Sequence, residues 1–120
     1  MLVKGKVFVV TGGASGLGAA TATHLVGLGG KVIMVDMNHE LGTEMQHRLG
    51  EHSEFVKLDV TDESAVEQFY KNIAEKYGQL NGLINCAGIG PSAKVLGKNG
   101  IHDLAAFQKV LNINVTGTFN

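Results

Sequence analysis

The 120-residue chain has little of several features that would define its class. It has one cysteine, one proline and no tryptophan, and its formal net charge is −1 at pH 7. A single cysteine excludes an intrachain disulfide and fits a reducing, intracellular compartment, either cytoplasmic or mitochondrial. The balanced charge gives no electrostatic reason to expect a nucleic acid or an anionic membrane as a partner. No apolar run approaches the roughly 20 residues that span a bilayer, and residues 1–6 are too short for a targeting peptide.

The histidines do not form a metal-binding pattern. None of them has an acid or a thiol at the spacing that metal sites use, so we expect no metal and interpret them as surface or capping residues. The chain has five: His24, His39, His47, His52 and His102.

Glycine, in contrast, is abundant, with 17 residues, and its arrangement is informative. Residues 11–18 read Thr-Gly-Gly-Ala-Ser-Gly-Leu-Gly and follow an apolar run at residues 7–10. Glycine has no Cβ, so backbone N–H groups can approach a pyrophosphate, and the following helix directs its positive end at the same anion. An ordinary strand-to-helix turn is the alternative. The motif predicts a dinucleotide site that includes Gly12, Ser15, Gly16, Leu17 and Gly18.

The spacing Gly-x-x-x-Gly-x-Gly, preceded by Thr11, resembles the short-chain dehydrogenase/reductase family. The predicted second strand, residues 31–36, ends in Asp36, and an acid about 20 residues after the glycines is expected to accept hydrogen bonds from the adenosine ribose. That carboxylate would repel the 2′-phosphate of NADP. Met37 and Ser15 stand where phosphate-preferring relatives often carry a base, so we expect NAD as the cofactor. The alternative for Asp36 is a simple turn or helix cap.

The next two predicted strands end in residues that the resemblance places in the cofactor crevice. After residues 54–58 come Asp59, which contacts the adenine amino group in the family, and Val60, which packs on the ring. Asp59 could instead shape the turn before the next helix. After residues 80–86, the family pattern Asn-Asn-Ala-Gly is matched with one departure, a cysteine in second place, which we interpret as a buried, inert thiol. The matching residues, expected along the crevice floor, are Asn85, Cys86, Ala87 and Gly88.

The resemblance also implies one catalytic residue in this chain. The family carries an Asn-Val-x-Gly-like segment whose asparagine takes part in the proton relay, and Asn114 matches it through its spacing to Gly117, with Asn112 as the nearest alternative. The family's catalytic Ser and Tyr-x-x-x-Lys have no counterpart, because Tyr70 and Tyr77 lack a lysine four residues later. We therefore expect this chain to be the amino-terminal half of a single-domain enzyme.

The exact residues of these motifs resemble those of the family members that oxidise 3-hydroxyacyl-CoA and hydroxysteroid substrates. Residues 91–102 resemble an insertion that these enzymes carry. The resemblance implies a small-molecule secondary alcohol as substrate and a homo-oligomer, a tetramer, for the whole enzyme. The other hypothesis is a non-catalytic nucleotide-binding or interaction module.

Hydrophobic periodicity predicts the elements that carry these motifs. Strands are expected near residues 6–11, 31–36, 54–58 and 80–86, and helices near 17–29, 40–50, 62–77 and 103–113, with a possible continuation to 120 after a short break. Right-handed crossovers give the strand order 3-2-1-4. The predicted fold is an incomplete, Rossmann-like, doubly wound parallel sheet with three layers, α/β/α. Its fourth strand is an apolar edge, through which we expect self-association.

Overall fold

A parallel four-stranded sheet forms the centre of the computed structural model, which describes residues 1–120. Its spatial order is β3-β2-β1-β4, so the predicted order is confirmed. The strands are β1 (Val7–Thr11), β2 (Lys31–Asp36), β3 (Ser53–Lys57) and β4 (Gly82–Asn85). The first, third and fourth strands differ by one or two residues from the predicted bounds, as strand ends usually do.

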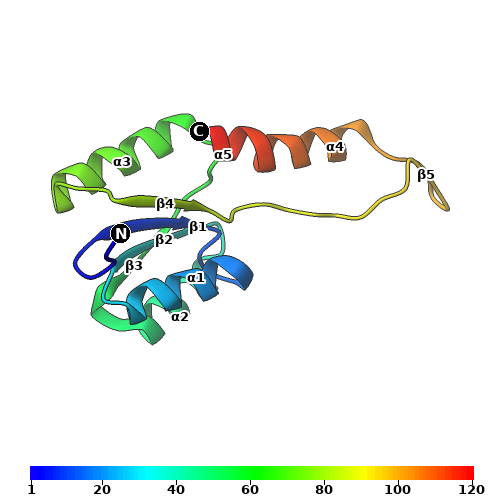
Figure 1. The fold of residues 1–120 in the computed structure, drawn as a ribbon. Coiled ribbons are helices and arrows are strands. Elements are labelled where there is room, and N and C mark those ends of the chain that lie inside the picture. Colours follow the sequence, from blue (N-terminus) through cyan, green and yellow to red (C-terminus); the bar gives the residue numbers. More distant parts are fainter.

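Helices cover both faces of this sheet and make three layers (Figure 1). Helices α1 (Gly16–Gly27) and α2 (His39–Leu49) lie on one face, and α3 (Glu63–Tyr77) lies on the other with the carboxyl-terminal helical segment. Strand side chains alternate between the layers. Those that pack with Phe69 and Ile73 of α3 are Val7, Val9, Ile33 and Val35. Those that pack with Ala22 of α1 and Met45 of α2 are Val10, Val32 and Met34.

The two central strands explain why the sheet forms. β1 and β2 are almost continuous runs of valine, isoleucine and other apolar residues, as expected for parallel strands that are buried on both faces. After β3, the chain crosses the sheet through α3 and returns as β4 on the far side of β1. The carboxyl ends of β1 and β4 therefore flank a topological switch point, where α/β proteins usually form their binding crevice.

Capping residues determine where the helices begin and end. The side chain of Asn38 accepts a hydrogen bond from the N–H of Leu41 at 3.0 Å, and Asp62 accepts one from Ala65 at 3.0 Å. Gly78 follows α3 in the left-handed region at φ 64°. The two N-caps follow β2 and β3 and position the loops on the crevice side, whereas Gly78 ends α3 at the opposite edge of the sheet, before β4.

The carboxyl-terminal helix is continuous, contrary to the predicted break. It consists of α4 (Leu104–Leu111), a π-helical segment η2 (Asn112–Thr116) and α5 (Gly117–Phe119). Gly117 does not interrupt it. A Cβ at this position would lie 2.6 Å from Cγ2 of Val60, so glycine permits close packing there rather than a turn.

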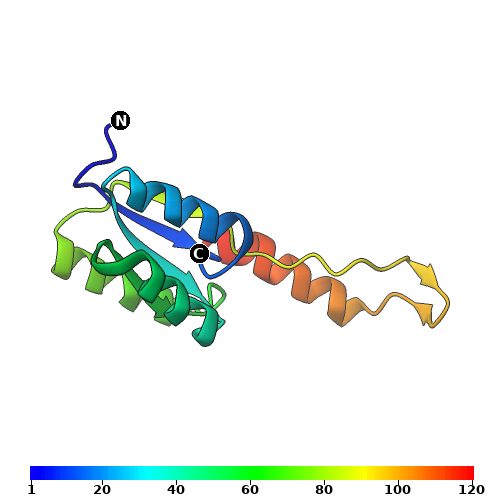
Figure 2. The same ribbon diagram turned by 90° about the horizontal axis from the view of Figure 1, so that it is seen from below.

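A small hairpin between β4 and α4 was not predicted. Strands β5 (Leu96–Gly97) and β6 (Gly100–Ile101) pair antiparallel and project away from the sheet (Figures 1 and 2). Two-residue strands carry too little periodicity to be detected in a sequence. The remaining element is a single 3₁₀ turn, η1 (Gly50–His52).

One face of the carboxyl-terminal helix is apolar and exposed. We call it the α4–α5 face, and its residues recur at helical spacing: Leu104, Phe107, Leu111, Val115 and Phe119. Despite such apolar stretches, none of the helices combines the length and hydropathy that crossing a bilayer requires.

Candidate functional site

A cleft of about 710 Å³ lies at the carboxyl ends of the parallel strands. The glycine-rich loop after β1, the residues that follow β2, β3 and β4, and helix α4 all contribute to its wall. This is the switch point that the topology creates, and its volume falls in the range of cofactor sites.

Two glycines of the loop are required by close contacts. A Cβ on Gly18 would lie 2.0 Å from the carbonyl oxygen of Gly12, so the first turn of α1 could not pack on the loop with any side chain at this position. Gly12 has φ 64°, and its Cβ would lie 2.8 Å from the backbone nitrogen of Ala87. At Gly16, with φ 53°, a Cβ would meet nothing within 4 Å, because this residue borders the open cleft.

The amino terminus of α1 presents backbone donors to this cleft. The backbone N–H groups of Gly16, Leu17 and Gly18 make no hydrogen bond within the protein. Ser15 occupies the N-cap position without a side-chain capping bond, and no acid lies in the first turn. The positive end of the helix is thus left uncompensated, which is the arrangement that binds a phosphate.

Asp36 lies at the end of β2, and each of its carboxylate oxygens accepts a backbone hydrogen bond. Oδ2 accepts from the backbone N–H of Ala14 at 3.1 Å, and Oδ1 accepts from that of Asn38 at 3.0 Å. Asp36 and the exposed Met37 line the cleft. A carboxylate oxygen can accept a second hydrogen bond, so the group can still bind a pair of hydroxyls.

Asp59 lines the cleft after β3 together with Val60. Its Oδ1 accepts from the hydroxyl of Thr61 at 2.7 Å and from the backbone N–H of Thr61 at 2.9 Å. These hydrogen bonds lower the pKa of the Asp59 carboxyl below its ordinary value, so it is ionised at neutral pH. An ionised carboxylate here can accept hydrogen bonds from an amino group such as that of adenine.

The end of β4 is fastened to the end of β1. The buried hydroxyl of Thr11 accepts from the backbone N–H of Cys86 at 3.2 Å and of Ala87 at 3.1 Å. Cys86 is half-buried rather than fully buried, since its side chain packs on the core beneath α1 while the residue also borders the cleft. Small residues on this wall keep the crevice open.

Asn114 holds the segment after β4 in place. Its Oδ1 accepts from the backbone N–H of Ile89 at 2.8 Å, and its Nδ2 donates to the carbonyl oxygen of Ile89 at 2.8 Å. The asparagine lies in the π-helical segment, an irregularity that often marks functional sites. Asn114 therefore acts on the cleft through Ile89, a residue of its wall.

The cleft brings together all the predicted cofactor-binding residues except one. Asn85 pairs with Thr11 in the sheet, and both residues border a separate small cavity under α3 and α5, of about 20 Å³. The alternation of strand side chains explains this, because Asn85 and Cys86 face opposite layers.

Sequence reasoning missed several cleft-lining residues. Three of them are next to predicted residues in the sequence, and this position could have identified them: Val35, Leu58 and Ile89. Lys109 and Ile113 lie on the carboxyl-terminal helix, four residues apart, and are brought in by the fold alone.

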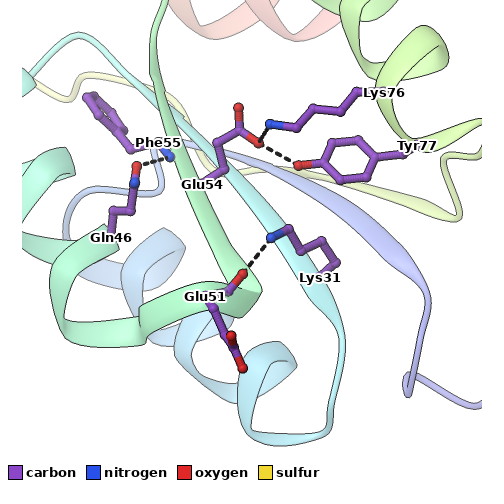
Figure 3. A network of polar contacts seen from close by, with 7 residues as sticks. All are labelled: Lys31, Gln46, Glu51, Glu54, Phe55, Lys76 and Tyr77. Carbon is purple, nitrogen blue, oxygen red and sulfur yellow. Dashed lines mark hydrogen bonds and ion pairs between the residues drawn. The ribbon is translucent and has the colours of Figure 1, made fainter.

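The tyrosines lie outside the cleft, and the possible metal ligands are not grouped together. Neither Tyr70 nor Tyr77 lines the cleft. Oε2 of Glu54 accepts a hydrogen bond from the hydroxyl of Tyr77 at 2.5 Å and another from the ammonium of Lys76 at 2.7 Å (Figure 3). No group of three or more His, Cys, Asp or Glu side chains could hold a metal ion.

Comparison with known proteins places this cleft in a family. Residues 6–120 match the model of the family described as short chain dehydrogenase. The chain is 43% identical to 3-hydroxyacyl-CoA dehydrogenase type-2 of Drosophila melanogaster over 99% of this chain and 48% of that protein. It is 42% identical to the Homo sapiens protein of the same name, over 98% of this chain and 46% of the relative. It is 40% identical to zerumbone synthase of Zingiber zerumbet, over 99% and 45%.

The chain spans about half the length of the curated relatives that it matches. The match covers every strand of the sheet and every wall of the cleft. Fold, cleft and sequence agree, and the chain belongs to the short-chain dehydrogenase family.

Proposed function

We propose that this chain is the cofactor-binding part of an NAD-dependent oxidoreductase that interconverts a secondary alcohol and a ketone. The observation that carries the proposal is the junction of β1 and α1. Unpaired N–H groups at the start of α1, glycines without room for a side chain, and a carboxylate at the end of β2 meet in one cleft. These are the donors and the acceptor that a pyrophosphate and a ribose require.

NAD is preferred to NADP in this proposal because of Asp36. Its carboxylate would accept hydrogen bonds from the two adenosine ribose hydroxyls and would repel a 2′-phosphate. No base follows it, since the next residue is Met37. Asp59 and Val60 would hold the adenine, and the backbone between Cys86 and Gly88 would form the floor under the rest of the dinucleotide.

For the substrate we propose a 3-hydroxyacyl-CoA, oxidised to the 3-ketoacyl-CoA, because the relatives at 42–43% identity bear that name. The bound dinucleotide would supply the hydride acceptor. This chain would contribute Asn114, which holds the cleft wall through Ile89. We propose a homo-oligomer, a tetramer, for the whole enzyme.

A second function is favoured by one observation. No tyrosine with a lysine four residues later exists in the chain, and neither of its tyrosines lines the cleft. Without a group that takes the hydroxyl proton, the chain would bind the dinucleotide and catalyse nothing, as a nucleotide-binding or interaction module.

Two parallel assays separate these functions. One follows NADH formation from 3-hydroxybutyryl-CoA and NAD by the whole enzyme of which this chain is proposed to be a part, and the other measures NAD binding to the chain without substrate. Turnover together with binding supports the oxidoreductase. Binding without turnover supports the module, and a folded chain that binds no NAD contradicts both.

A further inference from the structure

We propose that Asp36 is also a positioning residue, whose carboxylate fixes the conformation of the glycine-rich loop before any ligand is bound. This role would be additional to its contact with the ribose, and its effect on affinity rests on the dinucleotide-binding function proposed above.

The evidence is the pair of hydrogen bonds that the carboxylate makes in the protein itself. Oδ2 accepts from the N–H of Ala14, in the loop, at 3.1 Å, while Oδ1 accepts from the N–H of Asn38, at the start of α2, at 3.0 Å. Beside them, the N–H of Gly13 donates to the carbonyl oxygen of Val35 at 3.1 Å. The loop is therefore tied to the end of β2 at two successive residues.

The tie matters because Ala14 lies just before the start of α1. The residue is 5% exposed, and its N–H has no acceptor other than the carboxylate of Asp36. Losing that acceptor would leave a buried donor unpaired. The free N–H groups of α1 begin two residues later, at Gly16, whose backbone is intrinsically permissive. A charge-assisted hydrogen bond at Ala14 thus sets the direction in which those groups point.

This arrangement also affects cofactor choice. A carboxylate held by two backbone donors cannot rotate away from a 2′-phosphate without breaking both hydrogen bonds. Removing it would relieve the repulsion but would also loosen the loop that binds the pyrophosphate. We therefore expect substitution of Asp36 alone to weaken NAD binding without giving tight NADP binding.

The decisive probe is an NAD analogue that lacks both hydroxyls of the adenosine ribose. If Asp36 served only the ribose, Asp36→Ala would leave the affinity for this analogue unchanged or increase it. An increase would follow because the negatively charged pyrophosphate of the analogue would no longer be repelled by the carboxylate. Positioning of the loop predicts the opposite, a dissociation constant raised about five-fold or more. An unchanged or lower dissociation constant overturns the proposal.

A second measurement needs no ligand and separates this inference from the proposed function. Amide hydrogen exchange at Ala14 is expected to become about ten-fold faster in Asp36→Ala, and faster to a smaller degree in Asp36→Asn, which keeps one acceptor oxygen. Asp59→Ala removes the same charge from the same cleft but no bond to the loop, so exchange at Ala14 should stay as in the unsubstituted chain. Equal exchange in all the variants overturns the positioning role. Faster exchange in a chain that binds no dinucleotide supports it and contradicts the proposed function.

Discussion

Some positions of the cleft require a particular side chain, and others require that there be none. Gly18 must have no side chain, because a Cβ would lie 2.0 Å from a backbone oxygen of the same loop. Gly27 lies in the same helix, and a Cβ there would meet nothing within 4 Å.

We predict that Gly18→Ala lowers the free energy of unfolding by about 2 kcal/mol, because the loop or the helix must shift. Gly27→Ala should raise it by about 0.5–1 kcal/mol, through the better helix propensity of alanine. Urea denaturation of both variants measures the difference. Equal effects would contradict the close packing of α1 on the loop.

Asn114 and Asn112 form a second matched pair, three and five residues before Gly117 in the same π-helical segment. Only Asn114 hydrogen-bonds to Ile89 through its side chain. Asn114→Ala should lower the free energy of unfolding by about 1–2 kcal/mol, whereas Asn112→Ala should change it by less than about 0.5 kcal/mol. Thermal melts test this, and a larger loss for Asn112→Ala would refute the assignment of the structural role to Asn114.

At this scale the sequence predicted the polar cleft residues well but not all of their contacts. Motif spacing pointed to Asp36 because an acid is expected after the second strand. It could not show that Ala14 donates to the carboxylate, since that bond depends on how two loops approach each other. Motif spacing likewise could not show that Asn85 lies outside the cleft, because the layer that its side chain faces depends on the alternation along β4.

Among the elements, β3 is held at the edge of the sheet by polar contacts on both sides (Figure 3). Oε1 of Gln46, on α2, accepts from the backbone N–H of Phe55 at 2.7 Å, which satisfies a donor on the open edge. On the other side, Glu54 binds Lys76 and Tyr77 at the end of α3. These contacts join the edge strand to the helices that precede and follow it.

The Glu54 contacts give a pH dependence. Partial burial opposes ionisation of Glu54, but the hydrogen bonds from Lys76 and Tyr77 and the nearby positive charges outweigh it and lower its pKa below the ordinary 4.5. The stabilisation is therefore fully present above pH 4.5 and is lost as the pH falls through the lower pKa of the folded chain.

We predict that Glu54→Gln lowers the free energy of unfolding at neutral pH by no more than about 1 kcal/mol, because solvent screens the pair. The difference from the unsubstituted chain should shrink in acid. Glu67→Gln, which breaks the exposed ion pair with Lys71, is the control and should have an effect close to zero. A Glu54→Gln effect that grows in acid would contradict this account.

The regular elements were predictable because buried parallel strands are short continuous apolar runs, as in β1 and β2, and because amphipathic helices have a strong helical periodicity, as in α3. After β4 the helix near residues 103–113 was predicted as well, but the hairpin before it and the π-helical segment that makes it continuous were not. The β5–β6 hairpin is too short to show a pattern, and the π-helical segment depends on packing of α5 against Val60.

For the molecule as a whole, two apolar surfaces remain uncovered. One is the β4 edge, where Leu83 is 45% exposed. The other is the α4–α5 face, which includes Val115 at 61% exposed. Neither is capped in the way that Gln46 caps the β3 edge, so both can support association.

We predict that the chain self-associates through the β4 edge and that Leu83→Lys weakens this association at least several-fold by placing a charge on the open strand. Sedimentation velocity over a range of concentrations measures it, with circular dichroism to confirm folding. Leu2→Lys, at an exposed terminal residue, is the control. A monomeric chain at high concentration, or dissociation by Val115→Lys and not by Leu83→Lys, would refute the prediction.

The central claim is that the cleft binds NAD and that Asp36 selects it over NADP. Calorimetric titration of the chain with NAD and with NADP, repeated on Asp36→Ala, tests it most directly. The account predicts tighter binding of NAD than of NADP, and a preference that is lost in the variant. A folded chain that binds neither dinucleotide, or that binds NADP as tightly as NAD, would contradict it.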